Sequence, residues 1–301
     1  MRKDLFCLLL CSFCALSQLK AQDIDFPLSR REIEKYESRF KLCRQADVAI
    51  THPDAYLLRT SKAVYPDTVK IINLSIINRN APPTEPQYPW LMVWEKGKWV
   101  RFPFKPNISF AGIGHLLTQG KTFPEEIHLS AYQNPLQSGK RYQANIYVST
   151  ELDTYCILDG QKIRPVSGTE HKEAFTFRVL ESEEDSLRIL FENHTNLIVV
   201  PLFFPSVGSD EEYMLHPFAR SGWSGEAEYM RKFARLNGGE AMIFTIPVSW
   251  DVKRITDSNY RKKFSKGRLQ PGKYKIGLQL RVYLNTEFEV KNSHSGTTTG
   301  S

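Results

Sequence analysis

The feature that most constrains this chain is an alternation of apolar and polar residues with a period of two. It recurs in short stretches, among them residues 69–77, 143–148 and 275–280. This period places the apolar side chains of a stretch on one side of an extended strand. Turns rich in Gly, Pro and Asn separate the stretches. Short strands with such turns predict an all-β fold in which antiparallel sheets pack face to face as a sandwich.

The two halves of the chain repeat the same pattern. The strand ending at Asn78 matches one ending at Asn193, and both asparagines precede a loop. The turn at Gly139-Lys140 matches the turn at Gly272-Lys273, and each turn leads into an alternating strand. The two glycines lie 133 residues apart, a spacing that suits two whole domains and not a short solenoid repeat.

The length of 301 residues agrees with two domains and exceeds what one ordinary sandwich needs. We therefore predict two tandem sandwich domains, with residues 160–169 as a short connector between them. In chain order, we expect a signal peptide over 1–21, an N-terminal helical segment over 22–53, domain one over 54–163, domain two over 170–291 and a flexible tail over 292–301.

Particular residues of the first domain resemble those of a family of bacterial immunoglobulin-like domains found in exported proteins. The elements that carry the resemblance are Tyr65-Pro66, the strand ending at Asn78, Lys98-Trp99 with Pro103-Phe104, and the segment from Leu136 to Tyr142. The second domain keeps the segment from Leu269 to Tyr274 but lacks the Lys-Trp element. The resemblance implies two tandem antiparallel immunoglobulin-like β-sandwiches in an exported protein, and the family has no common assigned activity.

The first 21 residues have the composition of a secretory signal peptide. Arg2 and Lys3 provide a positive start, residues 5–16 form a short apolar core, and the small Ala21 precedes Gln22. The apolar core is too short for a membrane span, so we predict cleavage after Ala21 and a periplasmic or extracellular protein, with a retained anchor as the alternative. Because no later apolar stretch is long enough, no membrane span is expected after cleavage.

Residues 29–43 give the one helical signal before the strands. Ser29 is a suitable N-cap, with Glu32 three residues later. Ile33, Tyr36, Phe40 and Cys43 then recur at spacings of three and four, which makes one apolar stripe. We expect this helix to pack against the first sandwich, with a docking face for a partner as the alternative.

Three of the five cysteines lie in the predicted signal peptide, so the processed chain keeps Cys43 and Cys156. Two cysteines in an oxidising compartment are able to form one disulfide. Two separate buried thiols are an equally open interpretation at this point.

No catalytic, metal-binding or cofactor-binding motif is present in the sequence. The seven histidines lack the spacing of a helical zinc site, and no glycine-rich phosphate loop or nucleophile elbow occurs. We therefore predict a protein that is not an enzyme and that holds no cofactor or metal. The alternative is a carbohydrate-active sandwich, for which Glu125, Glu126, Asp153 and Glu170 are the available acids.

Two loops have the composition of recognition surfaces. The loop 205–225 combines aromatic residues with arginine, as interface hot spots do. The loop 250–268 is basic and suits an acidic glycan or another anionic surface. The candidate partner-binding residues are Tyr213, Phe218, Arg220 and Trp223 in the first loop, and Arg261, Lys262 and Lys263 in the second.

These features predict an exported, non-catalytic binding or structural module of the bacterial envelope. Its expected partner is an envelope protein or a surface polymer, recognised through loops. The alternative is an inhibitor or accessory subunit of a secreted protein. Nucleic acid is not an expected partner, because the basic residues behind the net charge of +7 are dispersed along the chain.

Overall fold

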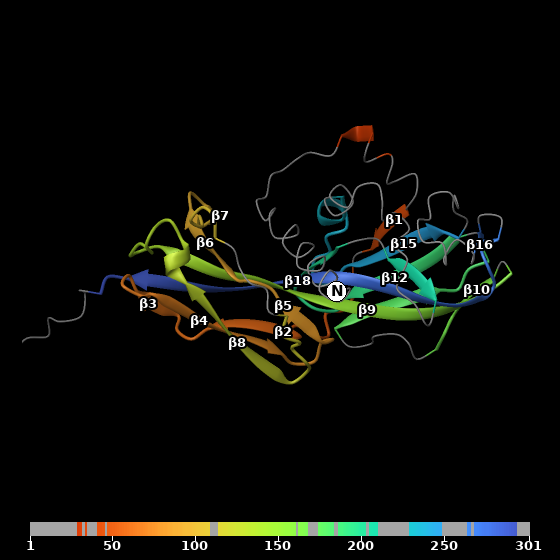
Figure 1. Ribbon diagram of the computed structural model, residues 1–301, viewed down its shortest axis with the longest axis horizontal. Helices are drawn as coiled ribbons and strands as arrows, with labels where there is room; N and C mark the ends of the chain where they lie inside the picture. Colours follow the sequence, from red (N-terminus) through yellow and green to blue (C-terminus); the bar gives the residue numbers. More distant parts are fainter. Residues whose placement is uncertain are drawn as a thin grey trace, which may run out of the picture.

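Antiparallel strands dominate the computed structural model, so the all-β prediction is confirmed (Figure 1). No helix among the residues that the structure describes is long and apolar enough to cross a membrane. The predicted signal peptide lies outside the described residues, as does most of the predicted tail. The described residues are 29–31, 34, 41–45, 47–108, 114–160, 162–167, 174–183, 186–202, 205–209, 229–248, 264–265 and 268–293.

In the first half of the chain, three strands form a small antiparallel sheet. They are β2 (Tyr56–Thr60), β4 (Ile71–Asn78) and β8 (Lys121–His128), in the order β2-β4-β8. Four further strands belong to a separate nine-stranded sheet: β3 (Val64–Pro66), β5 (Thr84–Pro86), β6 (Trp90–Glu95) and β7 (Lys98–Arg101). A single 3-10 turn, η1 (Leu129–Ala131), follows β8.

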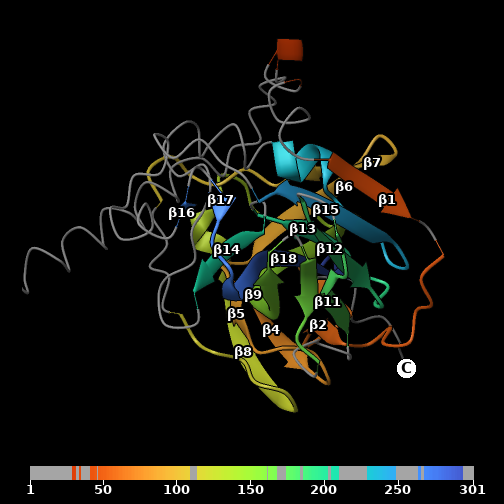
Figure 2. The same cartoon turned by 90° about the vertical axis from the view of Figure 1, so that its right-hand side faces the viewer.

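The second half repeats the small sheet and extends it by one strand. β11 (Phe175–Leu180), β12 (Ser186–Asn193) and β15 (Ala241–Pro247) pair in the same manner, and β1 (Lys41–Gln45) lies beside β15 (Figure 2). The second half also contributes three strands to the nine-stranded sheet, namely β10 (Lys162–Pro165), β13 (Ile198–Pro201) and β14 (Ser206–Ser209). β16 (Phe264–Ser265) and β17 (Arg268–Leu269) form a short pair, and residues 229–233 are helical.

Two long strands, β9 (Arg141–Asp159) and β18 (Gly272–Lys291), form the centre of the nine-stranded sheet. They pair over 18 consecutive positions in one register, from Arg141 opposite Glu289 to Leu158 opposite Gly272. Every even-numbered side chain of β9 from Tyr142 to Leu158 is buried. β18 follows the same rule from Tyr274 to Val290, with the half-buried Thr286 as its exception. The unbroken period of two therefore gives the pair one apolar face and one outer face.

Each long strand begins in its own half of the molecule and ends in the other. The first part of β9 pairs with β6 and β5, and its last part pairs with β10. β18 pairs first with β14 and β13 and finally with β3. In Figure 1 the two strands run along the long axis, with the strands of the first half at one end and those of the second half at the other. Each half therefore depends on a strand that continues from the other half.

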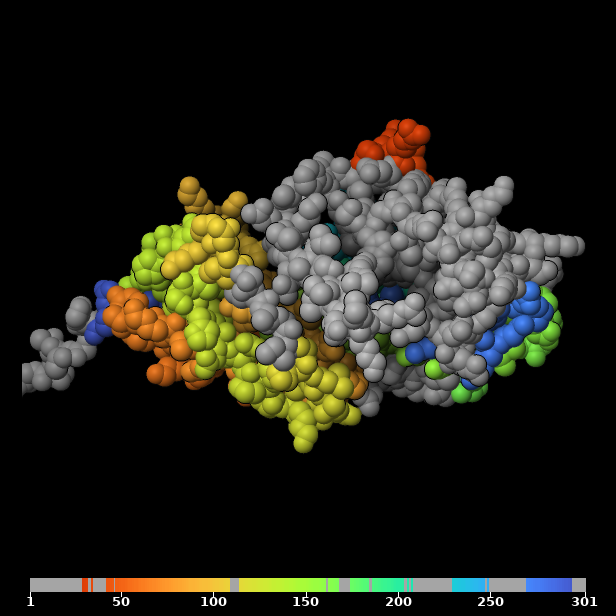
Figure 3. All heavy atoms as spheres, in the orientation of Figure 1, coloured from red at the N-terminus to blue at the C-terminus, as the bar shows by residue number. Residues whose placement is uncertain are grey.

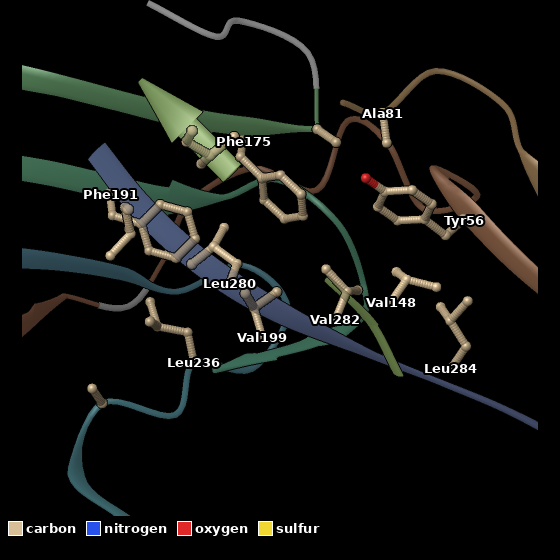
Figure 4. Packing of buried hydrophobic residues seen from close by; sticks show 14 of the residues in the cluster. Tyr56, Ala81, Val148, Phe175, Phe191, Val199, Leu236, Leu280, Val282 and Leu284 are labelled. Carbon is tan, nitrogen blue, oxygen red and sulfur yellow. The ribbon is translucent and has the colours of Figure 1, made fainter. Parts of the chain in front are cut away.

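The buried side chains form one main cluster that extends through both halves. Figure 4 shows Phe191 and Leu236 in the second half and Tyr56 in the first, with Leu280 and Val282 of β18 between them. A fully buried Leu, Ile or Phe side chain contributes about 1.5–3 kcal/mol relative to its exposed state. Since both halves bury their apolar faces on the same strand pair, packing as well as hydrogen bonding joins them.

The asparagine that ends β4 is a buried polar anchor for the loops around it. The Asn78 side-chain amide donates to the carbonyl oxygens of Pro82 and Leu117, both at 3.1 Å. Its side-chain oxygen accepts a hydrogen bond from the backbone N–H of Ala81 at 3.0 Å. Because the side chain is fully buried, these bonds replace those that water would make.

Asn193, at the end of β12, makes the corresponding contacts in the second half. Its amide donates to the carbonyl oxygens of Leu197 at 2.8 Å and Asn237 at 3.1 Å. Its side-chain oxygen accepts from the backbone N–H of Thr195 at 3.1 Å. The match between these two strands that the sequence predicts is thus confirmed at the level of individual hydrogen bonds.

The chain continues in the same way after each asparagine. Six residues on, Thr84 bridges to Leu117, and Val199 bridges to Leu236. Gly120, with φ of 74°, and Gly239, with φ of 73°, then donate from their backbone N–H groups to the carbonyl oxygens of Asn78 and Asn193. A positive φ at this point is the conformation that glycine adopts without strain.

The predicted pair of Gly-Lys turns also has a shared contact. The Tyr142 hydroxyl accepts a hydrogen bond from the backbone N–H of Gln137 at 2.8 Å. The Tyr274 hydroxyl donates to the carbonyl oxygen of Gln270 at 2.6 Å. In each half, a tyrosine near the start of the long strand therefore holds the turn that precedes it.

The N-terminal segment differs from the prediction. Arg30, Arg31 and Glu34 are helical, and Arg30 forms an ion pair with Glu34 at 2.9 Å. The helix does not reach Cys43, which lies in β1 opposite Ile243 of the second half. The prediction that Cys43 ends a helical stripe was therefore wrong. The open edge of β15 offers backbone hydrogen bonds to an extended segment, and that pairing overrides the local pattern.

The segment predicted as a connector, residues 160–169, also contains regular structure. β10 occupies Lys162–Pro165 and returns along the end of β9, with Ile163 opposite Leu158. Pro165 is compatible with this position, because an edge strand tolerates a residue that lacks an N–H donor.

The sharing of strands predicts that the first half does not fold without β18. A fragment of residues 54–150 lacks β18, the strand that pairs with β9. We therefore expect its circular dichroism to show no cooperative transition in urea. Fusing residues 280–291 after Thr150 through an Asn-Gly turn restores that strand, and we expect the transition to return. The register permits this short turn because Thr150 lies opposite Leu280.

A control fusion carries serine in place of Val282, Leu284 and Phe288, which keeps its length and removes most of its buried apolar face. We expect this control to remain unfolded. Cooperative unfolding of residues 54–150 alone would show that the first half does not depend on β18.

Replacing either anchoring asparagine is predicted to destabilise the protein strongly. Asn78→Ala or Asn193→Ala leaves buried carbonyl and N–H groups without partners, at a cost of about 2–3 kcal/mol in the free energy of unfolding. Asn73→Ala is the matched control, since Asn73 is exposed on the same strand as Asn78; we expect it to cost less than about 0.5 kcal/mol. Urea titration of the three variants measures the difference, and equal effects would contradict the anchoring role.

Candidate binding surface

The outer face of the nine-stranded sheet carries an unusual concentration of aromatic and guanidinium groups. It is formed by the odd-numbered residues of β9 and β18 together with the neighbouring side chains of β6 and β7. Three of the five tryptophans lie on this face. We call the following set the aromatic–guanidinium surface: Trp90, Trp94, Trp99, Arg101, Arg141, Tyr147, Arg281 and Tyr283.

The β6–β7 hairpin positions the outermost tryptophans. Lys96 and Gly97 form a two-residue turn with φ angles of 50° and 81°, the geometry of a type I′ hairpin turn. This turn sets the register in which Trp94 lies directly opposite Trp99. The two ring centroids are 5.2 Å apart in an edge-to-face arrangement, and Trp94 remains 38% exposed. The hairpin projects from the body of the molecule (Figure 3).

Arg141 joins this tryptophan pair to the central strands. Its guanidinium carbon lies 5.6 Å from the ring centroid of Trp94 and 5.8 Å from that of Trp99. The same guanidinium forms an ion pair with Glu287 of β18 at 2.5 Å. The exposed cation is therefore fixed from both sides, which orders the rings around it.

A second group of rings surrounds Tyr147. Its ring centroid lies 5.3 Å from that of Trp90 and 5.7 Å from that of Tyr283, the residue directly opposite on β18. The guanidinium carbon of Arg281 lies 4.4 Å from the Tyr147 centroid, and that of Arg101 lies 5.9 Å from the Trp90 centroid. Aromatic rings from three strands thus alternate with guanidinium groups.

Arg281 has one unsatisfied donor. Its Nε atom is buried and has no hydrogen-bond partner. A buried N–H group without an acceptor is costly, but because this atom is fully buried a ligand oxygen would reach it only after the side chain moves. From Arg141 to Tyr147 the surface extends over seven residues of β9, and the six steps between them span roughly 20 Å of extended strand. The arrangement suits an elongated ligand that offers apolar ring faces and hydrogen-bond acceptors.

The acids considered for catalysis do not form a pair in the described structure. Glu125 and Glu126 lie on β8 of the small sheet, and Glu126 contacts His128 at 3.2 Å. Asp153 lies on β9 of the other sheet and forms an ion pair with Lys275 at 2.8 Å. Glu170 lies outside the described residues. Among the residues described, no group of three or more His, Cys, Asp or Glu is placed to hold a metal ion.

The two cysteines of the processed chain are free thiols. Cys43 is exposed on β1, whereas Cys156 is buried in β9 opposite Tyr274. The structure therefore has no disulfide between them, and of the two interpretations left open by the sequence it shows separate thiols, only one of them buried. Burial raises the pKa of the Cys156 thiol to about 12, which keeps it protonated at neutral pH.

The residues that the sequence singled out for partner binding lie outside the described residues. These are Tyr213, Phe218, Arg220, Trp223, Arg261, Lys262 and Lys263. The aromatic–guanidinium surface was not predicted. One signal for it exists in the sequence, because Trp90, Met92 and Trp94 alternate along one strand and so share a face. The contribution of Tyr147 and Tyr283 depends on the pairing of distant strands, which no local pattern reveals.

Comparison with known proteins adds no assignment to this geometry. No protein-family model matches the chain, and no curated protein is significantly similar to it.

The state of the cysteines gives a direct prediction. For a chain beginning at Gln22, Ellman's reagent at pH 8 should label one thiol in the folded protein, because Cys43 is exposed and Cys156 is buried. Both thiols should react in guanidinium chloride. The Cys43→Ser variant serves as the control and should show none in the folded state. Labelling of no thiol under either condition would instead indicate a disulfide.

Proposed function

We propose that this protein is an exported, non-catalytic binding module of the bacterial envelope. The observation that supports the proposal most directly is the aromatic–guanidinium surface. Tryptophan, tyrosine and arginine are the residues that contribute most to binding energy at interfaces, and here they lie together on one face. The exposed indole of Trp94 and the half-buried rings beside it are apolar area that a partner would cover.

The proposed architecture is a pair of immunoglobulin-like sandwiches that exchange the ends of their long strands. The repeated anchors at Asn78 and Asn193 support two related units. The bonds of Tyr142 and Tyr274 to their preceding turns resemble the tyrosine corner of such sandwiches. Folds of this kind serve many functions, so the architecture supports a binding role only together with the surface.

The proposed location is the periplasm or the cell exterior. Arg2, Lys3, the apolar residues 5–16 and the Ala21-Gln22 junction support export. The basic loop containing Arg261, Lys262 and Lys263 remains a second proposed contact, since its charge suits an anionic surface.

Co-sedimentation with purified envelope fragments tests the proposed function. We expect the folded protein to pellet with Gram-negative envelope fragments, and we expect the Trp94→Ala, Trp99→Ala double variant to remain largely in the supernatant. Tyr155→Ala is the matched control, because Tyr155 has a similar contact with Lys273 at 4.9 Å but lies far along β9. Its pelleting should be unchanged.

A variant of Arg261, Lys262 and Lys263 to alanine separates the two proposed contacts. If only this variant loses co-sedimentation, the basic loop and not the sheet surface is the site. If the unaltered protein does not pellet at any salt concentration, the envelope-binding proposal is wrong.

A further inference from the structure

From the chemistry of the aromatic–guanidinium surface, we infer that its ligand is a neutral polysaccharide chain. This inference rests on the proposed function, since it names the ligand class for the same surface. Three properties lead to it: the extended shape of the surface, the mixture of ring faces with hydrogen-bond donors, and the balance of charge.

The shape of the surface favours a chain-like ligand. Its side chains come from odd-numbered positions, Arg141 and Tyr147 of β9 with Arg281 and Tyr283 of β18, and the β6–β7 hairpin continues the same face. Trp94, Arg101 and Arg141 are exposed on it. An arrangement that follows the strands for roughly 20 Å matches several units of an extended polymer better than one small molecule held in a pocket.

The rings supply the apolar part of recognition. The face of an indole or phenol ring is electron-rich, so it attracts the weakly positive C–H groups on the apolar face of a sugar ring. Trp90, Trp94 and Tyr147 lie on adjacent strands and therefore provide repeated contacts at separate points. A repeating polymer can use such points in succession.

The polar part of recognition comes from guanidinium groups beside the rings. Arginine has five N–H donors in a planar fork, which suits neighbouring hydroxyl oxygens of a sugar. The buried Nε of Arg281, next to Tyr147, lacks an acceptor. The exposed guanidinium groups of Arg101 and Arg141 are the donors that a sugar hydroxyl would reach directly while the sugar ring stacks on the aromatic side chains.

The charge balance distinguishes a neutral polymer from a polyanion. Arg141 is ion-paired with Glu287, and Lys140, beside the hairpin, is ion-paired with Glu95 at 2.7 Å. Farther along the strand pair, Lys275 of β18 is ion-paired with Asp153 of β9. Carboxylates offset these three cations, whereas Arg101 and Arg281 lie against the rings of Trp90 and Tyr147. The face therefore presents separate guanidinium groups and not the large continuous positive field that attracts nucleic acids or acidic glycans.

The surface is also ordered before a ligand arrives. Arg141 is held by two rings and a carboxylate, and Tyr147 is held by Trp90, Tyr283 and Arg281. Side chains that are fixed in advance lose little freedom on binding, which favours affinity for a ligand of modest contact area.

Affinity electrophoresis in native gels tests this inference. The gels contain barley β-glucan, yeast mannan or soluble starch as neutral polymers, and polygalacturonate as the acidic polymer. We expect at least one neutral polymer to retard the protein. Trp94→Ala and Trp90→Ala should each weaken that binding about tenfold or more, whereas Trp94→Phe should weaken it less.

Tyr155→Ala is again the control and should bind like the unaltered protein. Urea titration of every variant confirms that it is folded, so that loss of binding is assigned to the surface. Retardation by a neutral polymer should persist in 0.5 M sodium chloride, because ring stacking and hydrogen bonds are screened little by salt.

Three outcomes would overturn the inference. They are retardation by polygalacturonate alone with loss at high salt, equal retardation of Trp94→Ala and the unaltered protein, and retardation by none of the neutral polymers. If envelope co-sedimentation still depends on Trp94 and Trp99 in the last case, the proposed function stands and only the ligand class is wrong. If co-sedimentation is absent as well, both proposals are wrong.

Discussion

The antiparallel pairing of β9 with β18 is the interaction on which the other features of this protein depend. It continues in one register for 18 positions, so the period of two is never reset by a bulge. Even-numbered residues of β9 and β18 therefore face the core in both halves, and odd-numbered residues of these strands lie on the outer face of the sheet. A slip of one residue would bury Arg281 and expose Leu280, which removes the core and the candidate binding surface together.

Buried amides complement this pairing at the ends of the small sheets. Asn78 and Asn193 each bring together a strand end, the following loop and the segment before the next strand. Apolar packing alone does not specify where such loops lie, because it is non-directional. The hydrogen bonds of a buried amide are directional, and leaving them unmade is costly. The loops of both halves are thus positioned by the same short polar contact.

The local patterns of the sequence predict local structure well. The alternation in residues 69–77 predicts β4, the Gly-Lys turns precede the two long strands, and Lys96-Gly97 marks the β6–β7 turn. The exchange of strand ends was not predicted, because β9 continues past Val148 into a register set by residues more than a hundred positions away. The position of β1 depends in the same way on a distant open edge. The candidate surface contains features of both kinds. The alternation of its tryptophans is visible in the local sequence, whereas the contact of Tyr147 with Tyr283 depends on the pairing of two distant strands.

The same constraint explains why recognition on a sheet differs from recognition by loops. Loop side chains adapt to a partner and lose freedom when they bind, whereas the spacing of side chains on β9, β18 and β6 is fixed by backbone hydrogen bonds. Their separation along a strand is a multiple of the two-residue repeat, about 6.8 Å. A polymeric ligand whose repeating units match that spacing contacts several side chains at once, whereas one with a different spacing makes fewer contacts. The surface therefore selects between ligands by the distance between their repeating units. Because Arg141 and Tyr147 come from β9 while Arg281 and Tyr283 come from β18, the surface exists only when the two halves are joined.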